Sequence, residues 1–232
     1  FLGLNILLFI DNIVKYLIQN RTGIPAGASI LDVGCGTGGF AQLISDTYKP
    51  ICIDTSPIAI EYCKKRNIED AHVSTLSEFD TSGLNISAVT MLDVIEHIED
   101  DFGVVSQVFD ALPSGGWFVA TVPAFQKLWS RHDEIHHHYR RYNRFDFDTM
   151  LKKAGFNIKY SSYFNTILFL PAILKRVLDK ITGAEKKKNE PVEEVSELVN
   201  KVFTELFMLE KNILRRAILP FGLSIIAIAQ KD

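Results

Sequence analysis

Short apolar runs alternate with longer amphipathic segments over the first half of the chain, and this alternation constrains the fold more than any other feature. A strand that crosses over to a parallel neighbour needs a connection of a dozen or more residues, which is usually a helix. The sequence therefore predicts an α/β fold with a largely parallel sheet. The expected strands cover residues 29–34, 50–54, 71–75, 88–93 and 116–122, and the expected helices cover residues 39–46, 57–66 and 100–112.

The pattern changes after residue 125. Residues 126–144 are polar, aromatic and rich in histidine, and a helix at 145–154 is then expected before a sixth strand at 156–163 and a seventh at 219–230. The 55 residues between these two strands are far too many for a hairpin loop. We therefore expect one domain over residues 1–232 with a two-helix insertion at 166–218. Its apolar faces could cover the sheet, form a homodimer surface or make peripheral contact with a membrane beside a lipid-linked acceptor.

Composition excludes several classes of protein. The chain has 232 residues, of which 47% are hydrophobic and 23% charged, as expected for a globular domain with a sizeable core. A net charge of -3 gives no basic field for nucleic acid. Cys35, Cys52 and Cys63 are too few for a disulfide framework and are expected to be reduced thiols. The apolar run at residues 1–10 is about half a membrane span. These features predict a cytoplasmic protein that binds no nucleic acid.

A glycine-rich loop follows the first expected strand. Residues 31–40 read LDVGCGTGGF, and the glycines at 34, 36 and 38 let the backbone turn sharply and approach a ligand. The helix that follows offers unpaired N–H groups. Gly34, Gly36 and Gly39 also satisfy the dinucleotide spacing, so the loop alone fits NAD(P) as well as S-adenosylmethionine (SAM).

Two acidic residues flank this loop. Asp54 ends the second expected strand, where a carboxylate can accept both ribose hydroxyls of either cofactor. Asp32 lies inside the first strand, where a buried carboxylate needs a cationic or donor partner. The ammonium group of a methionine moiety is such a partner, whereas a pyrophosphate would be repelled. Asp32 therefore favours SAM, although it could instead tie down the loop backbone.

Four ordered motifs within residues 29–125 together resemble those of class I SAM-dependent methyltransferases. DxGxGxG stands at residues 32–38, DTSP at 54–57, MLDVIEHI at 91–98 and PSGGW at 113–117. The third resembles the fourth-strand motif of the ubiquinone/menaquinone-biosynthesis-like and Hen1-like branches. The resemblance implies a Rossmann-like, seven-stranded, mostly parallel sheet with helices on both faces and an antiparallel last strand. It also implies SAM as cofactor and S-adenosylhomocysteine (SAH) as product.

The resemblance assigns roles to particular residues. The glycine loop would hold the methionine part, Asp54 the ribose and the stretch after the third strand the adenine. Many members carry an aspartate where Thr75 stands, so adenine recognition is expected to rest more on backbone groups. The Leu92 carbonyl and Asp93 would lie near the methyl group. The expected cofactor site comprises Asp32, Gly34, Cys35, Gly36, Gly38, Asp54, Thr55, Ser74, Thr75, Leu76, Leu92 and Asp93.

Four of the six histidines lie within residues 132–138, after the fifth strand and at the edge where open α/β sheets bind ligands. The segment resembles the HD…HxRRY region of bacterial methyltransferases often found with cell-surface polysaccharide functions. A hydroxyl or protonated amine acceptor needs a general base, and histidine titrates in the right range. Asp133 could orient such a base. The alternative is a hydrogen-bonded lid that touches no substrate. The candidate bases are His132, His136 and His138, and the candidate substrate-binding residues are Arg140, Arg141 and Tyr142.

The fourth-strand motif fits either a metal site or a structural role. Asp93, Glu96 and His97 would share one helical face, and with His136 or His138 they would offer oxygen and nitrogen ligands for a divalent ion. Hen1-like enzymes use such an arrangement but carry a glutamate where Asp93 stands. The favoured interpretation is that His97 caps the turn after the strand, so no metal is expected.

These features together predict transfer of a methyl group from SAM to a small-molecule, glycan or lipid-linked acceptor. One alternative is an NAD(P)-dependent oxidoreductase or epimerase, which would share the glycine spacing. Another is a catalytically silent protein that binds SAM and transfers nothing.

Overall fold

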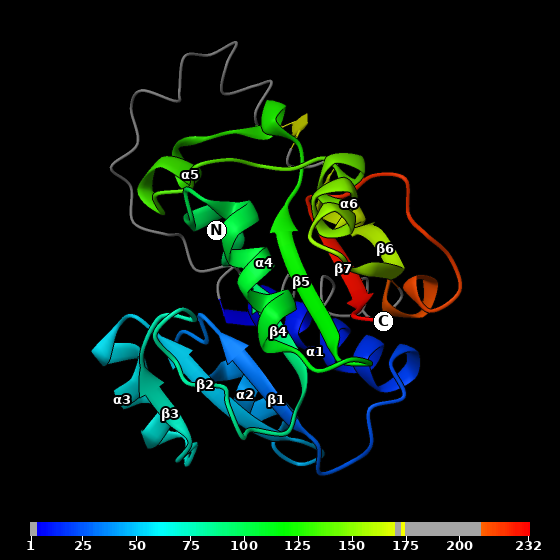
Figure 1. Cartoon of the computed structure of the whole chain (residues 1–232). Helices are drawn as coiled ribbons and strands as arrows, with labels where there is room; N and C mark the ends of the chain where they lie inside the picture. Colours follow the sequence, from blue (N-terminus) through cyan, green and yellow to red (C-terminus); the bar gives the residue numbers. More distant parts are fainter. Residues whose placement is uncertain (1–3, 170–172, 175–209) are drawn as a thin grey trace.

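One mixed sheet organises the molecule (Figure 1). The computed structural model describes residues 4–169, 173–174 and 210–232. Within them the strands follow the order β3-β2-β1-β4-β5-β7-β6 across the sheet. Their bounds are β1 (Ser29–Val33), β2 (Lys49–Asp54), β3 (Ala71–Val73), β4 (Ile86–Leu92), β5 (Trp117–Pro123), β6 (Asn157–Phe164) and β7 (Ser224–Gln230).

The last strand alone runs against the others in the described sheet. β7 pairs antiparallel with both β5 and β6, whereas β1 to β5 pair in parallel. This confirms the Rossmann-like α/β sheet with an antiparallel last strand. The seventh strand begins at Ser224 rather than at residue 219, where Leu219 makes only an isolated bridge to Tyr163. Pro220 has no N–H to donate to a ladder, which accounts for the late start.

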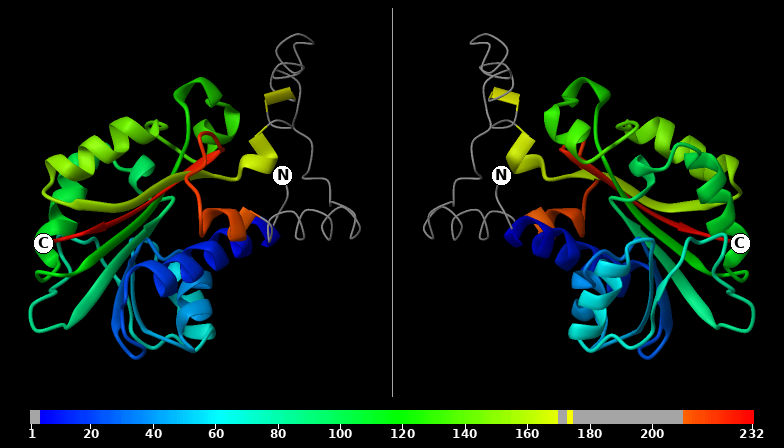
Figure 2. Two further views of the ribbon diagram at one scale, coloured as in Figure 1. Left: turned by 90° about the vertical axis from the view of Figure 1, so that its right-hand side faces the viewer. Right: turned by 90° about the vertical axis from the view of Figure 1, so that its left-hand side faces the viewer.

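Helices cover both faces of the sheet (Figure 2). Alternate residues of β1 divide between two apolar clusters: Ile30 packs with α1 and α2, whereas Leu31 and Val33 pack with the opposite layer. α1 (Leu4–Arg21), α2 (Gly39–Ile44) and α3 (Pro57–Lys65) lie on one face, and α4 (Asp101–Ala111) and α6 (Arg144–Lys153) lie on the other. The buried core therefore lies in two layers, one on each side of the strands.

Helix α1 is an element that the sequence analysis did not assign. The apolar run at the start of the chain continues as a helix to Arg21. Ile13, Val14, Leu17 and Ile18 are fully buried at the spacing of one helical face. None of the helices in the described part of the chain is long and apolar enough to cross a membrane.

Capping side chains fix where several helices begin. Ser56 accepts a hydrogen bond from the Ala59 amide before α3, and Pro57 follows at the first helical position. Asp100 caps α4 through the Gly103 amide at 2.9 Å, so this helix begins one residue later than expected. Asn143 caps α6 in the same way.

The histidine-rich segment after β5 contains short helices. It contains a short 3-10 helix, η2 (Gln126–Leu128), and one turn of helix, α5 (Arg131–Ile135). A further 3-10 turn, η1 (Ile95–His97), follows β4. Most of the two-helix insertion expected at 166–218 lies outside the described residues.

Candidate active site

The glycine loop between β1 and α2 requires glycine at two positions for steric reasons. Gly34 has φ +70°, and a Cβ there would lie 2.6 Å from Cγ2 of Val94. Gly38 has φ +76°, and a Cβ there would lie 2.8 Å from Sγ of Cys63. Both positions combine a left-handed backbone with no room for a side chain. The loop is thus pressed between the segment after β4 and helix α3.

Asp54, at the end of β2, holds the loop directly. Its Oδ2 accepts a hydrogen bond from the Gly36 amide at 2.9 Å, and its Oδ1 accepts one from the Ser56 amide at 2.8 Å. Each carboxylate oxygen can accept further bonds. The structure therefore places an oriented carboxylate beside the glycine loop. Its expected role in binding a ribose stays a prediction.

Asp32 is buried inside β1, as its strand position predicted. Its Oδ1 accepts a hydrogen bond from Oγ1 of Thr90 at 2.6 Å, and burial raises its pKa to about 7. The bond runs to β4 rather than to the loop backbone, which disfavours the alternative that Asp32 serves to tie down the loop. A buried carboxyl with a raised pKa is stabilised as an anion when a cation binds beside it.

The carboxyl groups of Asp11 and Asp93 also lie at this edge of the sheet, and Asp11 is close enough to Asp32 and Asp93 to feel their charge. Burial, followed by the nearby Asp32 and Asp93 carboxyls, raises the pKa of Asp11 to about 7. Oδ2 of Asp11 lies 3.7 Å from where a Cβ of Gly39 would stand. Burial raises the pKa of Asp93 to about 6. Sequence reasoning missed Asp11 because it assigned no helix there. A lone acidic residue in the apolar run at residues 6–14 was the available signal.

The backbone is unusual where β4 and β5 end. Asp93 follows β4 with φ +53°, and Phe125 stands shortly after β5 with φ +59°. The Asp93 amide donates to both the carbonyl and the hydroxyl oxygen of Thr121 at 3.0 Å, which holds this conformation. Positive φ at non-glycine residues is uncommon and tends to occur at functional sites.

The stretch expected to cover the adenine follows β3. Thr75 is exposed, and its amide and hydroxyl both donate to Oε2 of Glu78, at 3.3 and 2.8 Å. Leu76 is buried and Ser74 half-buried, whereas Thr55 beside Asp54 is exposed. The amide and the hydroxyl of Thr75 are therefore both already engaged within the chain, and adenine recognition by this stretch stays a prediction.

Asp133 organises the histidine-rich segment. Its buried carboxylate accepts a bidentate pair from Arg141, with Nε at 2.7 Å from Oδ1 and Nη2 at 3.0 Å from Oδ2. Nδ1 of His138 lies 3.0 Å from the same Oδ1. Of the three candidate bases, the described side chains thus pair His138 with Asp133, whereas His136 is exposed. The side chain of His132 lies outside the described part.

Burial and these contacts set the charge states of His138 and Asp133. Burial lowers the pKa of His138, and the hydrogen bond that its Nδ1 donates to Asp133 only partly opposes this. Burial acts to raise the pKa of Asp133, but the hydrogen bonds and charge of Arg141 outweigh it, so that pKa is lowered. At neutral pH the pair is therefore a neutral imidazole oriented by an ionised carboxylate, which is the state that a general base requires.

Arg140 and Tyr142 also have partners within the chain. Nη1 of Arg140 lies 2.7 Å from Oδ2 of Asp101, and its Nη2 donates to the Glu99 carbonyl at 2.6 Å. The Tyr142 hydroxyl donates to the same Asp101 oxygen at 2.8 Å. Because Arg141 binds Asp133, all three candidate substrate-binding residues make hydrogen bonds or ion pairs within the chain. This favours the interpretation that they hold the segment together, and their contact with substrate stays a prediction.

Glu96, His97 and His138 come together beside the lid. Their ligand-capable atoms lie within 4.8 Å of one another, and the rings of His97 and His138 meet edge to face at 4.5 Å. Burial, followed by the nearby Asp93, raises the pKa of Glu96 well above its usual value. Its Oε2 is buried without a hydrogen-bond partner among the described residues. These three residues could hold a divalent ion, whereas Asp93 is not part of the cluster. The expectation of no metal stays untested.

Comparisons with known proteins place the chain in a family. The family model described as "Methyltransferase domain" matches residues 8–161. A probable S-adenosylmethionine-dependent methyltransferase of Mycolicibacterium smegmatis is 28% identical over 138 residues, covering 58% of this chain and 54% of the relative. A ubiquinone biosynthesis O-methyltransferase of Xanthomonas axonopodis pv. citri is 27% identical, covering 42% of this chain and 44% of the relative. The chain spans about half the length of the curated relatives it matches.

Solved structures share the fold. A SAM-dependent methyltransferase from Archaeoglobus fulgidus has a TM-score of 0.59 and 19% identity, over 99% of this chain and 95% of that one. The Haemonchus contortus phosphoethanolamine N-methyltransferase 2, solved with phosphomonomethylethanolamine and SAH, has a TM-score of 0.58 and 20% identity, over 94% of this chain and 52% of that one. The family model covers well over half of the 232-residue chain. The chain therefore belongs to the family of S-adenosylmethionine-dependent methyltransferases.

Proposed function

We propose that this protein transfers the methyl group of SAM to a hydroxyl or amine of a small-molecule, glycan or lipid-linked acceptor. The observation that carries the proposal is the pairing of His138 with the buried Asp133. Both residues belong to the segment at 126–144 that follows β5, which we call the lid. The glycine loop and Asp54 stand at the same carboxyl edge of the sheet, because β1, β2, β4 and β5 run in parallel. The edge thus combines a cofactor loop with a group that can take up a proton.

The cofactor side of the reaction rests on charge and shape. SAM carries an ammonium and a sulfonium, and Asp32, Asp11 and Asp93 offer carboxyl groups that a nearby cation would ionise. A Cβ at Gly36 would meet nothing within 4 Å, so the loop backbone there is open to the close approach of a ligand. Asp54 would accept the ribose hydroxyls with the carboxylate that Gly36 already orients.

The acceptor side needs positioning and a base. The sulfonium is a good leaving group, so the enzyme mainly aligns the acceptor atom with the methyl group and excludes water. As the new bond forms, the acceptor loses a proton, which Nε2 of His138 would take up. Asp133 would then stabilise the resulting imidazolium through Nδ1. Arg141 keeps Asp133 ionised and in place. Arg141 would therefore affect proton transfer indirectly, by positioning Asp133 and through it His138.

The acceptor class is supported by two resemblances. The segment at residues 138–142 matches the H-x-R-R-Y pattern of bacterial methyltransferases associated with cell-surface polysaccharides. One curated relative is an O-methyltransferase of ubiquinone biosynthesis. Both favour an oxygen acceptor on a glycan or a lipid-linked molecule. Peripheral contact with a membrane or a homodimer through residues 166–218 would suit such an acceptor, and a cytoplasmic location remains part of the proposal.

Cofactor identity is the first experiment. Calorimetry should show binding of SAH and none of NAD, because NAD would bring a pyrophosphate toward Asp32. Heat with NAD and none with SAH would favour the oxidoreductase or epimerase instead.

A panel of acceptors then tests transfer. Phenols, sugar nucleotides and polyprenyl-linked sugars are offered with SAM, and methylated product is detected by mass spectrometry. Methylation of a phenol or a sugar hydroxyl supports the proposal. SAH binding without methylation of any acceptor in the panel would favour the silent SAM-binding protein.

A further inference from the structure

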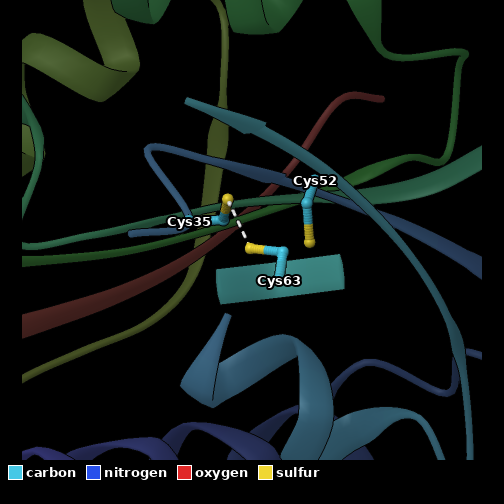
Figure 3. A group of neighbouring side chains, drawn as sticks. All are labelled: Cys35, Cys52 and Cys63. Carbon is cyan, nitrogen blue, oxygen red and sulfur yellow. Dashed lines mark hydrogen bonds between the residues drawn. The ribbon is translucent and has the colours of Figure 1, made fainter. Parts of the chain in front are cut away.

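The three cysteines of the chain meet at one point (Figure 3). Cys35 belongs to the glycine loop, Cys52 to β2 and Cys63 to α3. Their sulfur atoms all lie within 4.8 Å of one another, and the Sγ atoms of Cys35 and Cys63 are 3.7 Å apart. Cys52 and Cys63 are buried, whereas Cys35 is half-buried. An ion would therefore reach the three thiols from the side of Cys35.

The spacing of the sulfur atoms suits a metal. Sulfur ligands at the Zn–S bond length of about 2.3 Å in a tetrahedron are roughly 3.8 Å apart. The 3.7 Å between Cys35 and Cys63 already matches this separation. The third sulfur needs a shift of about an ångström or less, which is within the reach of a rotation about χ1.

The surroundings select a soft cation. Ala41, Ile60, Ile68 and Ala71 pack around the thiols and bring no oxygen or nitrogen side-chain ligand. No histidine, aspartate or glutamate of the described residues joins the group. Thiolates prefer zinc and other thiophilic ions, whereas magnesium and calcium prefer oxygen. Three thiolates and one divalent cation also leave a smaller buried charge than three thiolates with a monovalent ion.

We propose that Cys35, Cys52 and Cys63 form a three-thiolate site for zinc, or for a thiophilic ion of the same charge, that ties the glycine loop to β2 and α3. On binding, three S–H bonds break, three metal–sulfur bonds form, and three protons pass to the buffer with no change of oxidation state. The half-exposed side at Cys35 leaves the fourth coordination position to water. Nothing in this proposal depends on the methyl-transfer reaction.

The thiols of Cys63 and Cys35 both contact the backbone of the glycine loop. Burial raises the pKa of Cys63 to about 12. Its Sγ donates to the Gly36 carbonyl at 3.4 Å, and Cys35 makes a weaker contact of 3.7 Å with the same oxygen. The metal must displace these protons, so the apparent affinity is expected to rise with pH. It would also replace these weak contacts to the loop by bonds to one ion.

Cadmium is a suitable probe because thiolate ligands give it an ultraviolet charge-transfer absorption that carboxylate and imidazole ligands do not. The whole chain, reduced by a phosphine rather than a thiol, is titrated with Cd²⁺, and Zn²⁺ is then added in competition. The proposal predicts saturation at one equivalent and loss of the absorption as zinc displaces cadmium. Absence of the absorption at any ratio would overturn it.

Variants locate the site. Cys35→Ser, Cys52→Ser and Cys63→Ser should each weaken cadmium binding about a hundredfold, since one of three thiolates is lost. The matched control is Glu96→Gln with His97→Ala, which removes the other candidate cluster and should leave the absorption unchanged. A signal that survives in Cys63→Ser and needs only Cys35 would mean binding to one surface thiol, and would refute the site.

A measurement on the unaltered protein covers the case in which the buried Cys52 or Cys63 variants do not fold. Zinc should slow alkylation of Cys35 by iodoacetamide, as followed by mass spectrometry, and should raise the midpoint of thermal unfolding. Cys35→Ser, whose position is half-exposed, should fold and lose the increase in midpoint. An equal increase in that variant would contradict the proposal.

Discussion

Nδ1 of His138 lies 3.0 Å from Oδ1 of Asp133, a carboxylate with no exposed side-chain surface. The same oxygen is bound by Nε of Arg141 at 2.7 Å. One buried carboxylate therefore orients an imidazole and neutralises a guanidinium at once. Because Asp133 and His138 are separated by the turn that ends α5, this pairing also fixes the course of the lid.

Substitution of His138 tests the proposed base. His138→Ala should lower kcat by about a hundredfold or more, because the acceptor proton loses its carrier, while SAH affinity stays within a few fold. The measurement is turnover with an acceptor from the panel. Since burial lowers the pKa of His138, turnover of the unaltered enzyme should be constant near neutral pH and fall only in acid.

The matched control is His72→Ala. His72 forms the same kind of pair, with Nε2 at 2.7 Å from Oδ1 of Asp70, but both residues are exposed at the far edge of the sheet. This variant should keep full turnover. Equal loss in both variants, or none in His138→Ala, would refute the assignment.

Substitution of Arg141 tests the internal role of the lid arginines. Arg141→Ala leaves the Asp133 carboxylate buried without its guanidinium partner, and should lower the free energy of unfolding by about 3–5 kcal/mol. Urea denaturation followed by circular dichroism measures this. Arg140→Ala is the control, because its ion pair with Asp101 is partly exposed and should cost less than about 1 kcal/mol. The Ser130 amide and hydroxyl also donate to Oδ2 of Asp133, at 2.8 and 3.1 Å, and a small loss in Arg141→Ala would mean that these bonds mainly hold the carboxylate.

Asp54 tests the expected ribose contact. Asp54→Ala should weaken SAH binding at least about tenfold, since each hydrogen bond to a charged acceptor contributes roughly 1.5–3 kcal/mol. Part of the loss would come from the Gly36 amide, which loses its acceptor. Asp80→Ala is a matched control, because Asp80 accepts from the Ser82 amide in an exposed turn remote from the loop. Unchanged calorimetric affinity in a folded Asp54→Ala protein would place the ribose elsewhere.

Asp32 should make SAH binding depend on pH. The SAH ammonium favours the ionised carboxylate, so binding below pH 7 releases a proton and the affinity should rise with pH until about 7. Calorimetry in buffers of different ionisation enthalpy detects that proton. Asp32→Asn should bind more weakly and with less dependence on pH. A flat profile in the unaltered protein would contradict the raised pKa.

The same shift affects stability without ligand. The pKa of Asp32 is raised from 3.8 to about 7, so the protonated form stabilises the fold. That contribution is complete below pH 3.8 and is lost as the pH rises through about 7. Asp32→Asn should therefore gain stability over the unaltered protein as the pH rises through this window, as measured by urea denaturation.

Removal of metal tests the cluster at Glu96. Because burial raises the pKa of Glu96, its carboxyl is expected to keep its proton, which makes it a poor ligand for a divalent ion. Treatment with a strong chelator should leave methyl transfer unchanged. Loss of turnover that Mg²⁺ or Mn²⁺ restores, and that Glu96→Gln abolishes, would show instead that the cluster is a metal site.

Local patterns were enough to predict much of the scaffold. The alternation of apolar strands and amphipathic helices is a pattern of residues close together in the sequence. It predicted the order along the chain and the approximate bounds of all seven strands. The glycine loop was predictable because glycine, which lacks a Cβ, readily adopts the positive φ found at Gly34 and Gly38. The need of Asp32 for a donor partner followed from an acid placed within an apolar strand, although its donor, Thr90, was not predicted.

Other features were decided only by the tertiary structure. The sequence offered three candidate bases without distinguishing them, and the burial of Asp133 paired it with His138 among the described side chains. Asp11 reaches the site only because α1 packs against the sheet, and Cys35, Cys52 and Cys63 meet only when the loop, β2 and α3 are assembled. The physical reason is the same in each case. Spacing along the chain fixes the direction of a side chain relative to its own helix or strand, whereas contacts between distant segments depend on how those elements pack.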